Sequence, residues 1–191
     1  MNYTANLAIG LAMEQMFQAT TDIIDVRLRD IWQHTAKIAS FCYVIAKKYT
    51  KIPAEEATLA ALVHRLGVLP ILTYAEESDL LLNDELLLDD VIEQLHGEIG
   101  GILLKKWDFP NAITELPLSY QNINNANQVA DCSDIIKVAT LLESQNQYTS
   151  WSSIEWSQVP SFSTLNIPCD ANSEEVIDIC NEVKNSHFLI N

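Results

Sequence analysis

Apolar residues recur along most of this chain at steps of three and four, the spacing that places them on one face of an α-helix. The clearest stretch predicts a long amphipathic helix over 27–48. Its apolar face is formed by Leu28, Ile31, Thr35, Ile38, Cys42 and Ile45, and continues to Tyr49. Because no credible pair of strands is found between turn residues, we predict an all-α protein.

Turn and capping residues predict where further helices begin and end. Pro53 and the acids Glu55 and Glu56 favour a helix start, and Gly67 favours its end. Short or moderate helices are also predicted over 69–75, 89–106, 127–143 and 173–185, the last with Ser173 as its N-cap. The segment 150–168 is predicted to be a long packed loop.

Two adjacent glycines, Gly100 and Gly101, interrupt the predicted helix over 89–106. Each costs a helix about 1 kcal/mol relative to alanine. A helix tolerates this cost where another backbone must approach closely. We therefore expect close helix packing at this point.

Length and composition are those of an ordinary globular protein. The chain has 191 residues, of which 48% are apolar, enough for one hydrophobic core. No uninterrupted apolar run approaches the roughly 20 residues of a membrane span, and no signal peptide is evident. Four cysteines lack a C-x-x-C pair and predict neither a zinc site nor a disulfide framework; they are Cys42, Cys132, Cys169 and Cys180. A cytoplasmic protein is the expectation.

The charge distribution argues against nucleic acid as a partner. The formal net charge is −15, and 66–104 contains no lysine or arginine. That stretch carries Glu76, Glu77, Asp79, Asp84, Glu85, Asp89, Asp90, Glu93 and Glu98. Such a surface repels phosphate backbones. Six of the 11 basic residues lie between Arg27 and Lys51, which we interpret as a solvated helix face.

Three histidines, His34, His64 and His96, lie in three separate predicted helices. Imidazoles brought together in this way could hold a divalent metal such as zinc. The alternative is that each histidine is hydrogen-bonded within a helix interface. Arg65 follows His64 directly. A guanidinium about 4 Å from a dication would oppose metal binding by roughly 8 kcal/mol as an upper bound.

The order of these motifs resembles the HDOD family, a regulatory branch of the HD phosphohydrolase superfamily found in bacterial signalling proteins. The motifs are Ile31-Trp32-Gln33-His34-Thr35, Ala60-Ala61-Leu62-Val63-His64-Arg65-Leu66-Gly67, Leu95-His96-Gly97-Glu98-Ile99-Gly100 and Lys105-Lys106-Trp107-Asp108-Phe109-Pro110. The resemblance spans roughly 6–143. It implies a compact multi-helix bundle of the HD type.

The resemblance also implies a degenerate site. Catalytic relatives carry a His-Asp pair where this chain has His64 and Arg65, then further ligands where it has Gln121, Asn122 and Thr140. Every expected carboxylate is thus absent, so no metal or other cofactor is expected. Should a divalent metal bind, its ligands would be His34, His64 and His96. We expect Arg65 to be neutralised by an acid, with Glu98, Asp131 and Asp134 as the candidates.

The resemblance further divides the chain, treated as one domain over 1–191, into three parts. Residues 1–25 correspond to a remnant of an upstream lobe, 26–148 to the HD-like core, and 149–191 to a C-terminal loop and helix. The sequence does not decide whether the natural protein is short or this chain is a fragment.

Two functions are compatible with these observations. The favoured one is a non-catalytic signalling module that acts through protein contacts; the alternative is a metal-dependent phosphohydrolase with an atypical histidine site. A predicted contact surface for a protein partner, or for self-association, lies on 6–17. It includes Leu7, Leu11, Met13, Met16 and Phe17, which surround a helix with apolar groups on nearly every side.

Overall fold

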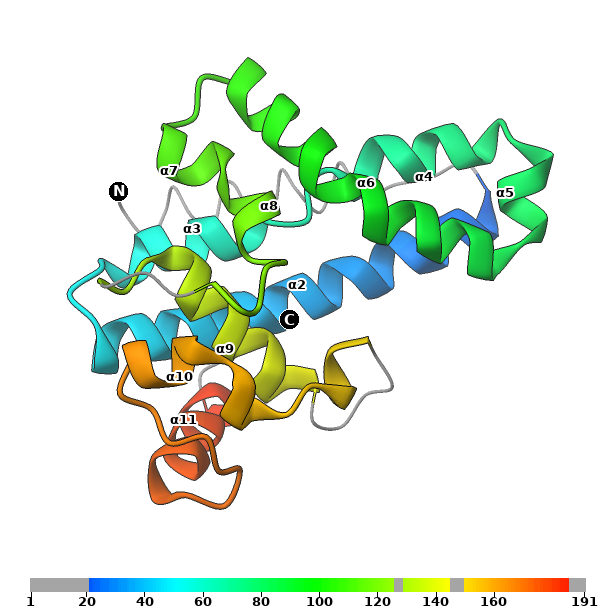
Figure 1. Ribbon diagram of the computed structural model, residues 1–191. Helices are drawn as coiled ribbons and strands as arrows, with labels where there is room; N and C mark the ends of the chain where they lie inside the picture. Colours follow the sequence, from blue (N-terminus) through cyan, green and yellow to red (C-terminus); the bar gives the residue numbers. More distant parts are fainter. Residues whose placement is uncertain (1–20, 126–128, 145–149, 186–191) are drawn as a thin grey trace.

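The computed structural model describes residues 21–125, 129–144 and 150–185. The predicted contact surface, with Leu7, Leu11, Met13, Met16 and Phe17, lies outside these residues. The described residues form helices without strands, so the all-α prediction is confirmed (Figure 1).

The longest element, α2, spans Asp22–Tyr49 and begins earlier than its apolar period predicted. Two features extend it. Asp22 and Asp25 stand in the first turn, where carboxylates interact favourably with the helix dipole, and Ile24 is fully buried. The helix ends where the Thr50 hydroxyl donates to the carbonyl of Ala46.

Two short helices follow, α3 (Ala54–Val63) and α4 (Val68–Glu76). The sequence predicted one helix up to Gly67, but α3 ends at Val63 and turns connect it to α4. Residues Ala54–Glu76 are long and apolar enough, by composition alone, for a membrane span, yet 72% of their apolar 18-residue window (mean hydropathy 1.4) is buried inside the protein. Its apolar character is therefore that of a core segment.

The acidic, leucine-rich part of the chain forms α5 (Asp79–Asn83) and α6 (Glu85–Lys106). Helix α6 begins before the predicted position 89 because the Asp84 side chain accepts a hydrogen bond from the amide of Leu87 and so caps it. The small α7 (Asn111–Thr114) and α8 (Leu116–Ser119) lie along α6 (Figure 1).

Glycines let other backbones approach α6 closely, as predicted for Gly100 and Gly101. A Cβ on Gly67 would lie 2.0 Å from the carbonyl oxygen of His96 and 2.5 Å from the amide nitrogen of Gly100. A Cβ on Gly101 would lie 2.9 Å from the carbonyl oxygen of Thr114. The turn before α4 and the end of α7 therefore sit directly on the α6 backbone.

The C-terminal part contains α9 (Cys132–Ser144), the 3-10 turns η1 (Ser150–Ser153) and η2 (Trp156–Gln158), α10 (Pro160–Thr164) and α11 (Glu174–Asn185). The prediction of a plain loop over 150–168 was wrong, because Pro160 starts a helix that buries Phe162. Ser173 accepts a hydrogen bond from the amide of Val176, as expected of an N-cap.

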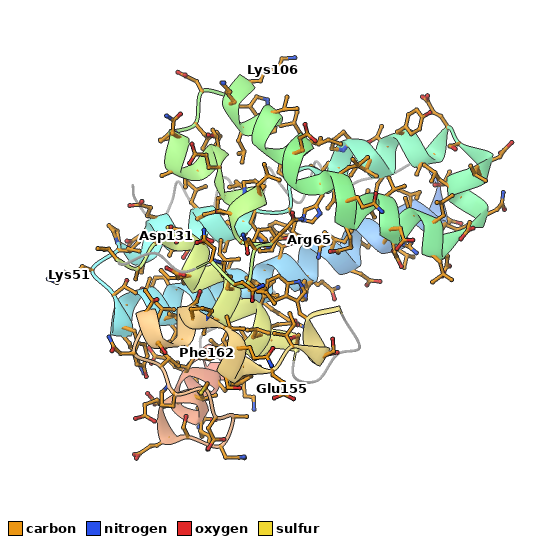
Figure 2. The ribbon with its side chains drawn as sticks, in the orientation of Figure 1. Lys51, Arg65, Lys106, Asp131, Glu155 and Phe162 are labelled. Carbon is orange, nitrogen blue, oxygen red and sulfur yellow. The ribbon has the colours of Figure 1, made fainter. Side chains whose placement is uncertain are left out.

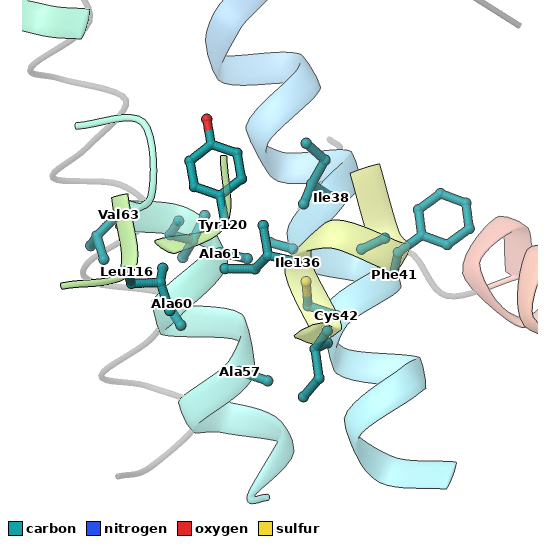
Figure 3. Close-up of a cluster of buried hydrophobic side chains, with 14 of the residues drawn as sticks. Ile38, Phe41, Cys42, Ala57, Ala60, Ala61, Val63, Leu116, Tyr120 and Ile136 are labelled. Carbon is teal, nitrogen blue, oxygen red and sulfur yellow. The ribbon is translucent and has the colours of Figure 1, made fainter. Parts of the chain in front are cut away.

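The main core lies between α2, α3 and α9, with side chains from the α8 segment completing it (Figure 3). Figure 3 shows Ile38 and Cys42 from α2 facing Ala57 and Ala61 from α3, with Ile136 from α9 between them. The small alanines allow α3 to lie close to α2. This arrangement holds the middle of α2, which carries His34, near the end of α3, which His64 follows.

A buried polar cluster joins α9 to α10 and to the segment before α9. Asp134 and Lys137 are 1% and 2% exposed. The Ser161 hydroxyl donates to Asp134 Oδ1 at 2.6 Å, and Lys137 Nζ donates to the carbonyl oxygen of Asn125 at 2.8 Å. Lys137 Nζ also lies 4.0 Å from Asp134 Oδ1. Burial raises the pKa of Asp134 and lowers that of Lys137, so both charges are held at a desolvation cost.

Candidate functional site

Two of the three predicted histidines, His64 and His96, lie against one aromatic ring, that of Tyr120, just after α8. The His64 ring meets the Tyr120 ring edge-on with centroids 4.8 Å apart, and the His96 ring lies 6.1 Å away. Tyr120 is 3% exposed, and in Figure 3 its hydroxyl points away from the apolar cluster. Burial raises the pKa of Tyr120 to about 12, so it acts as a neutral hydroxyl.

His64 stands directly after α3 and is 1% exposed. Its Nδ1 contacts the carbonyl oxygen of Ala61 in the last turn of α3. The pKa of His64 is lowered to about 3, mainly by burial and also by the nearby positive charge of Arg65, against the opposing effect of the Ala61 carbonyl. The imidazole is therefore neutral at physiological pH.

The buried neutral state of His64 predicts a loss of stability in acid. In the unfolded chain the pKa is 6.5, whereas the folded protein resists protonation down to about 3. As the pH falls below 6.5 the unfolded state therefore binds a proton that the folded state does not. This group alone removes roughly 2–3 kcal/mol from the free energy of unfolding between pH 7 and pH 4.5.

Urea unfolding at both pH values measures this loss, with His64→Gln as the comparison. The variant is expected to lose roughly 2–3 kcal/mol less than the wild type over the same interval. The pKa of His96 is also lowered, but His96 is present in both proteins and contributes to both losses. Equal losses in the two proteins would contradict the buried neutral imidazole.

His96 comes from α6, one turn before the glycines that α4 and α8 approach. Its Nδ1 lies 2.7 Å from the carbonyl oxygen of Ile92, and its Nε2 lies 2.7 Å from the hydroxyl of Tyr120. The side-chain amide nitrogen of Gln121, a position predicted for the site, is 2.9 Å from Nε2 of His96. Burial is the main cause that lowers the pKa of His96, and the positive charge of Arg65 is the next. Both ring nitrogens of His96 therefore have polar partners within the protein.

His34, on α2, faces α9. Its Nδ1 lies 2.8 Å from Glu143 Oε2, within ion-pair distance, although the geometry falls short of a hydrogen bond. Lys37 Nζ lies 3.8 Å from the other carboxylate oxygen of Glu143. Glu143 is thus the acid that α9 brings to His34, one turn beyond the predicted position Thr140.

Arg65 lies beside the two buried imidazoles and reaches toward α6. Its Nη2 is 3.3 Å from Glu93 Oε1, and its side chain is 19% exposed. Among the residues that the structure describes, its buried Nε has no hydrogen-bond partner. An acid therefore pairs with Arg65, as expected. That acid is Glu93, and not one of the predicted candidates Glu98, Asp131 and Asp134.

Geometry explains why the other acids do not pair with Arg65. Glu98 is exposed and lies five positions after Glu93, which places it on another side of α6. Asp134 is engaged by Ser161, and Asp131 accepts from the amide of Asp134 at 3.0 Å. Figure 2 shows Asp131 well apart from Arg65.

Two further predicted positions, Asn122 and Thr140, make hydrogen bonds with nearby backbone groups. Asn122 is exposed, and its amide donates to the carbonyl of Ser119 in a turn. Thr140 is buried, and its hydroxyl donates to the carbonyl oxygen of Ile136 in its own helix at 2.8 Å. Neither makes a described contact with the three histidines.

Sequence reasoning missed Tyr120, Glu93, Glu143 and Trp151. The ring of Trp151, from η1, is stacked on Tyr120 with centroids 6.0 Å apart and planes 8° apart. Only Tyr120 carried a usable signal, because it immediately precedes Gln121, which had been aligned with the site. The others come from helix faces or a 3-10 turn that contain no motif.

The side chains of this site do not fit the metal that HD-type phosphohydrolases imply. Both histidine Nδ1 atoms face backbone carbonyls, a pattern that leaves Nε2 for a metal. However, Nε2 of His96 is taken by Tyr120 and Gln121, and Arg65 places a fixed cation beside both rings. Within 21–125, 129–144 and 150–185, no group of three His, Cys, Asp or Glu is arranged to hold a metal ion.

Comparison with known proteins places this site in a family. The model of the HDOD domain matches residues 1–123, which is more than half of the chain. The chain belongs to the HDOD family. The family match includes His34, His64, Arg65, His96 and Tyr120, but ends before α9, which supplies Glu143, and before η1, which supplies Trp151.

A solved structure from Shewanella amazonensis, provisionally described as a metal-dependent phosphohydrolase, has a TM-score of 0.71 to this HDOD protein at 22% sequence identity. The similarity covers 94% of this chain and 66% of that one. At this identity it shows a shared all-α fold of the HD type. No curated protein matches this chain.

Proposed function

We propose that this HDOD protein is a non-catalytic bacterial signal-transduction module that acts through protein contacts on a degenerate phosphohydrolase scaffold. The observation that supports it most is Arg65, which stands beside His64 and His96 and is paired with Glu93. A metal ion of the HD type requires carboxylate charge in its first coordination shell. Arg65 supplies the opposite charge.

The environment of the histidines supports the same proposal. His64 and His96 are 1% exposed, and Tyr120 lies in contact with both rings. A hydrolytic centre needs an open position for water and substrate beside its metal. Here the space beside the imidazoles is filled by an aromatic ring that itself carries a stacked tryptophan.

The output in this proposal is binding of a protein, either a partner or a second copy of the chain. The acidic surface makes nucleic acid an unfavourable partner. The buried character of Ala54–Glu76 gives no reason to invoke a membrane, and we propose a cytoplasmic location.

The proposal predicts that the protein purified without chelator contains far less than one equivalent of zinc, iron or manganese. It also predicts no hydrolysis of a generic phosphodiester when Mn²⁺ is added. The reason is the repulsion between Arg65 and a dication, together with the engaged Nε2 of His96. Elemental analysis and a chromogenic phosphodiester assay measure these two quantities.

Substitution of His64 and His96 by glutamine provides the control. About one equivalent of metal in the wild type that is lost in the double variant, with hydrolysis lost in parallel, overturns the proposal. Residual metal that is equal in the two proteins is bound elsewhere and leaves the non-catalytic assignment in place.

The alternative, a metal-dependent phosphohydrolase with an atypical site, has one specific observation in its favour. The Nδ1 atoms of His64 and His96 face backbone carbonyls, as they do in many histidine ligands. The same metal and hydrolysis measurements decide between the two functions.

A further inference from the structure

A groove of about 850 Å³ lies between the N-terminal half of α2 and the first half of α6, and Arg65 is one of its lining residues. Ile23, Val26 and Ile31 line one wall, and Ile92 lines the other. Ile23 and Val26 are 55% and 58% exposed, although Ile24 between them is fully buried. On the groove side of α2, Ile23 and Val26 therefore form an exposed apolar strip, whereas the neighbouring face of α2 that carries Ile24 is buried.

Acidic residues outnumber basic residues around the groove. Its lining includes five carboxylates, Asp22, Asp30, Glu85, Asp89 and Glu93, against the two guanidinium groups of Arg27 and Arg65. Arg27 pairs with Asp89 and lies 4.0 Å from Glu85, while Arg65 pairs with Glu93. Each guanidinium is thus already neutralised by an acid of α6.

Two carboxylates on α2 remain without a cation. Within the part of the chain that the structure describes, neither Asp22 nor Asp30 takes part in an ion pair, and both are exposed. They stand eight positions apart, so both lie on the side of α2 that carries Val26. An apolar strip flanked by unneutralised carboxylates is complementary to apolar side chains flanked by lysine or arginine.

The shape of the groove favours a helix over a small molecule. Pockets for small ligands bury roughly 70–90% of the ligand surface. Here the rim is open, since the side chains of Glu85 and Asp89 are 79% and 57% exposed. An amphipathic helix buries only one face, at spacings of three and four residues, and leaves the other in water.

We infer that this groove is a docking site for a basic amphipathic helix of a partner protein. This inference rests on the proposed function as a protein-contact module and names the surface and the chemistry of its partner. The apolar face of the helix covers Ile23 and Val26, and its cations meet Asp22 and Asp30. Arg65, paired with Glu93, also lines the groove.

The test uses the full chain and a labelled peptide of about 18 residues, long enough to be partly helical alone. The peptide carries leucines at i, i+3, i+4 and i+7 with lysines on either side of them. Fluorescence anisotropy is expected to show saturable binding that weakens as salt rises from about 50 to about 500 mM. A scrambled peptide of the same composition keeps the charge but has no apolar face, and is expected to bind at least about tenfold more weakly.

Matched variants locate the binding. The exposed double change Ile23→Ser with Val26→Ser, and separately Asp30→Lys, are each expected to weaken binding about tenfold. The controls Ile177→Ser and Glu155→Lys change another exposed apolar residue and another exposed acid outside the groove, and are expected to change the affinity less than about twofold. Circular dichroism melting checks that every variant is folded.

Equal binding of the scrambled peptide, an undiminished affinity in the groove variants, or no binding to the wild type would each overturn the docking site. None of these results bears on the metal and hydrolysis measurements. Conversely, a metal-loaded, hydrolytic wild type would reject the proposed function whatever the peptide does. The two failures are therefore distinguishable.

Discussion

Replacement of Gly67 by alanine is expected to lower the free energy of unfolding by about 3 kcal/mol or more. The added Cβ would lie 2.0 Å from the carbonyl oxygen of His96 and 2.5 Å from the amide nitrogen of Gly100. Both atoms belong to the α6 backbone and cannot move aside as a flexible side chain can. The turn before α4 must therefore separate from α6.

The backbone conformation at Gly67 adds no strain of its own to this clash. Gly67 has φ −64° and ψ −12°, which alanine adopts freely. Alanine even reduces the entropy of the unfolded chain, by about 0.4–1 kcal/mol in favour of folding. The predicted loss is therefore the cost of the close approach, reduced by this small entropy gain.

Gly100→Ala is the matched control for Gly67→Ala. Its Cβ would meet the amide nitrogen of Gly67 at 3.2 Å and Pro117 at 3.3 Å, distances that small shifts relieve. Alanine also favours the helix by about 1 kcal/mol. Chemical denaturation is expected to show at least about 2 kcal/mol between the two variants. A Gly67→Ala protein as stable as the wild type would contradict the predicted contact between this turn and α6.

A comparably large loss, about 3 kcal/mol, is expected for Lys137→Met. The lysine is 2% exposed and is the cation beside the buried carboxylate of Asp134. Its removal leaves Asp134 with an uncompensated charge and the carbonyl of Asn125 without this donor. The Ser161 hydroxyl still donates to Asp134, which limits the loss.

The pH dependence of the Lys137→Met defect has a definite sign. Burial raises the pKa of Asp134 in the folded protein above its value of 3.8 in the unfolded chain. The folded state therefore takes up a proton first as the pH falls, and protonation removes the uncompensated charge. The stability difference between Lys137→Met and wild type is expected to shrink from pH 7 toward pH 5.

Two further variants complete the test of the buried pair. Asp134→Asn in the Lys137→Met background is expected to recover at least about 1 kcal/mol, because it removes the charge and keeps an acceptor for Ser161. Lys51→Met, at an exposed position, is expected to change stability by less than about 0.5 kcal/mol. If Lys137→Met behaves like Lys51→Met, the buried pair contributes nothing to stability.

Helical periodicity was sufficient to predict the larger elements. The stripe from Leu28 to Ile45 predicted α2, and Ser173 predicted the start of α11, because amphipathic faces and caps are local properties of the sequence. Short elements such as α10 contain too few residues to establish a period. For this reason Pro160 and Phe162, which start and anchor α10, were read as part of a loop.

The candidate site was predictable only in part for a related reason. His64, His96 and Gln121 come together as their motifs indicated. The partner of Arg65 was not predictable, because the choice between Glu93 and Glu98 depends on how α6 is rotated about its axis. That rotation is set by the contact of Gly67 with Gly100, which is a tertiary feature.

In the proposed function, the stacked rings of Tyr120 and Trp151 would oppose metal binding even if position 65 carried an acid. An aspartate at position 65 would restore one ligand, yet it would remove the cation that faces Glu93 and would leave Nε2 of His96 bound to Tyr120. Tyr120 is itself held in place by a tryptophan that lies outside the family-matched residues. Position 65 is thus tied into a connected set of contacts, so exchanging this one residue would not by itself open a metal site.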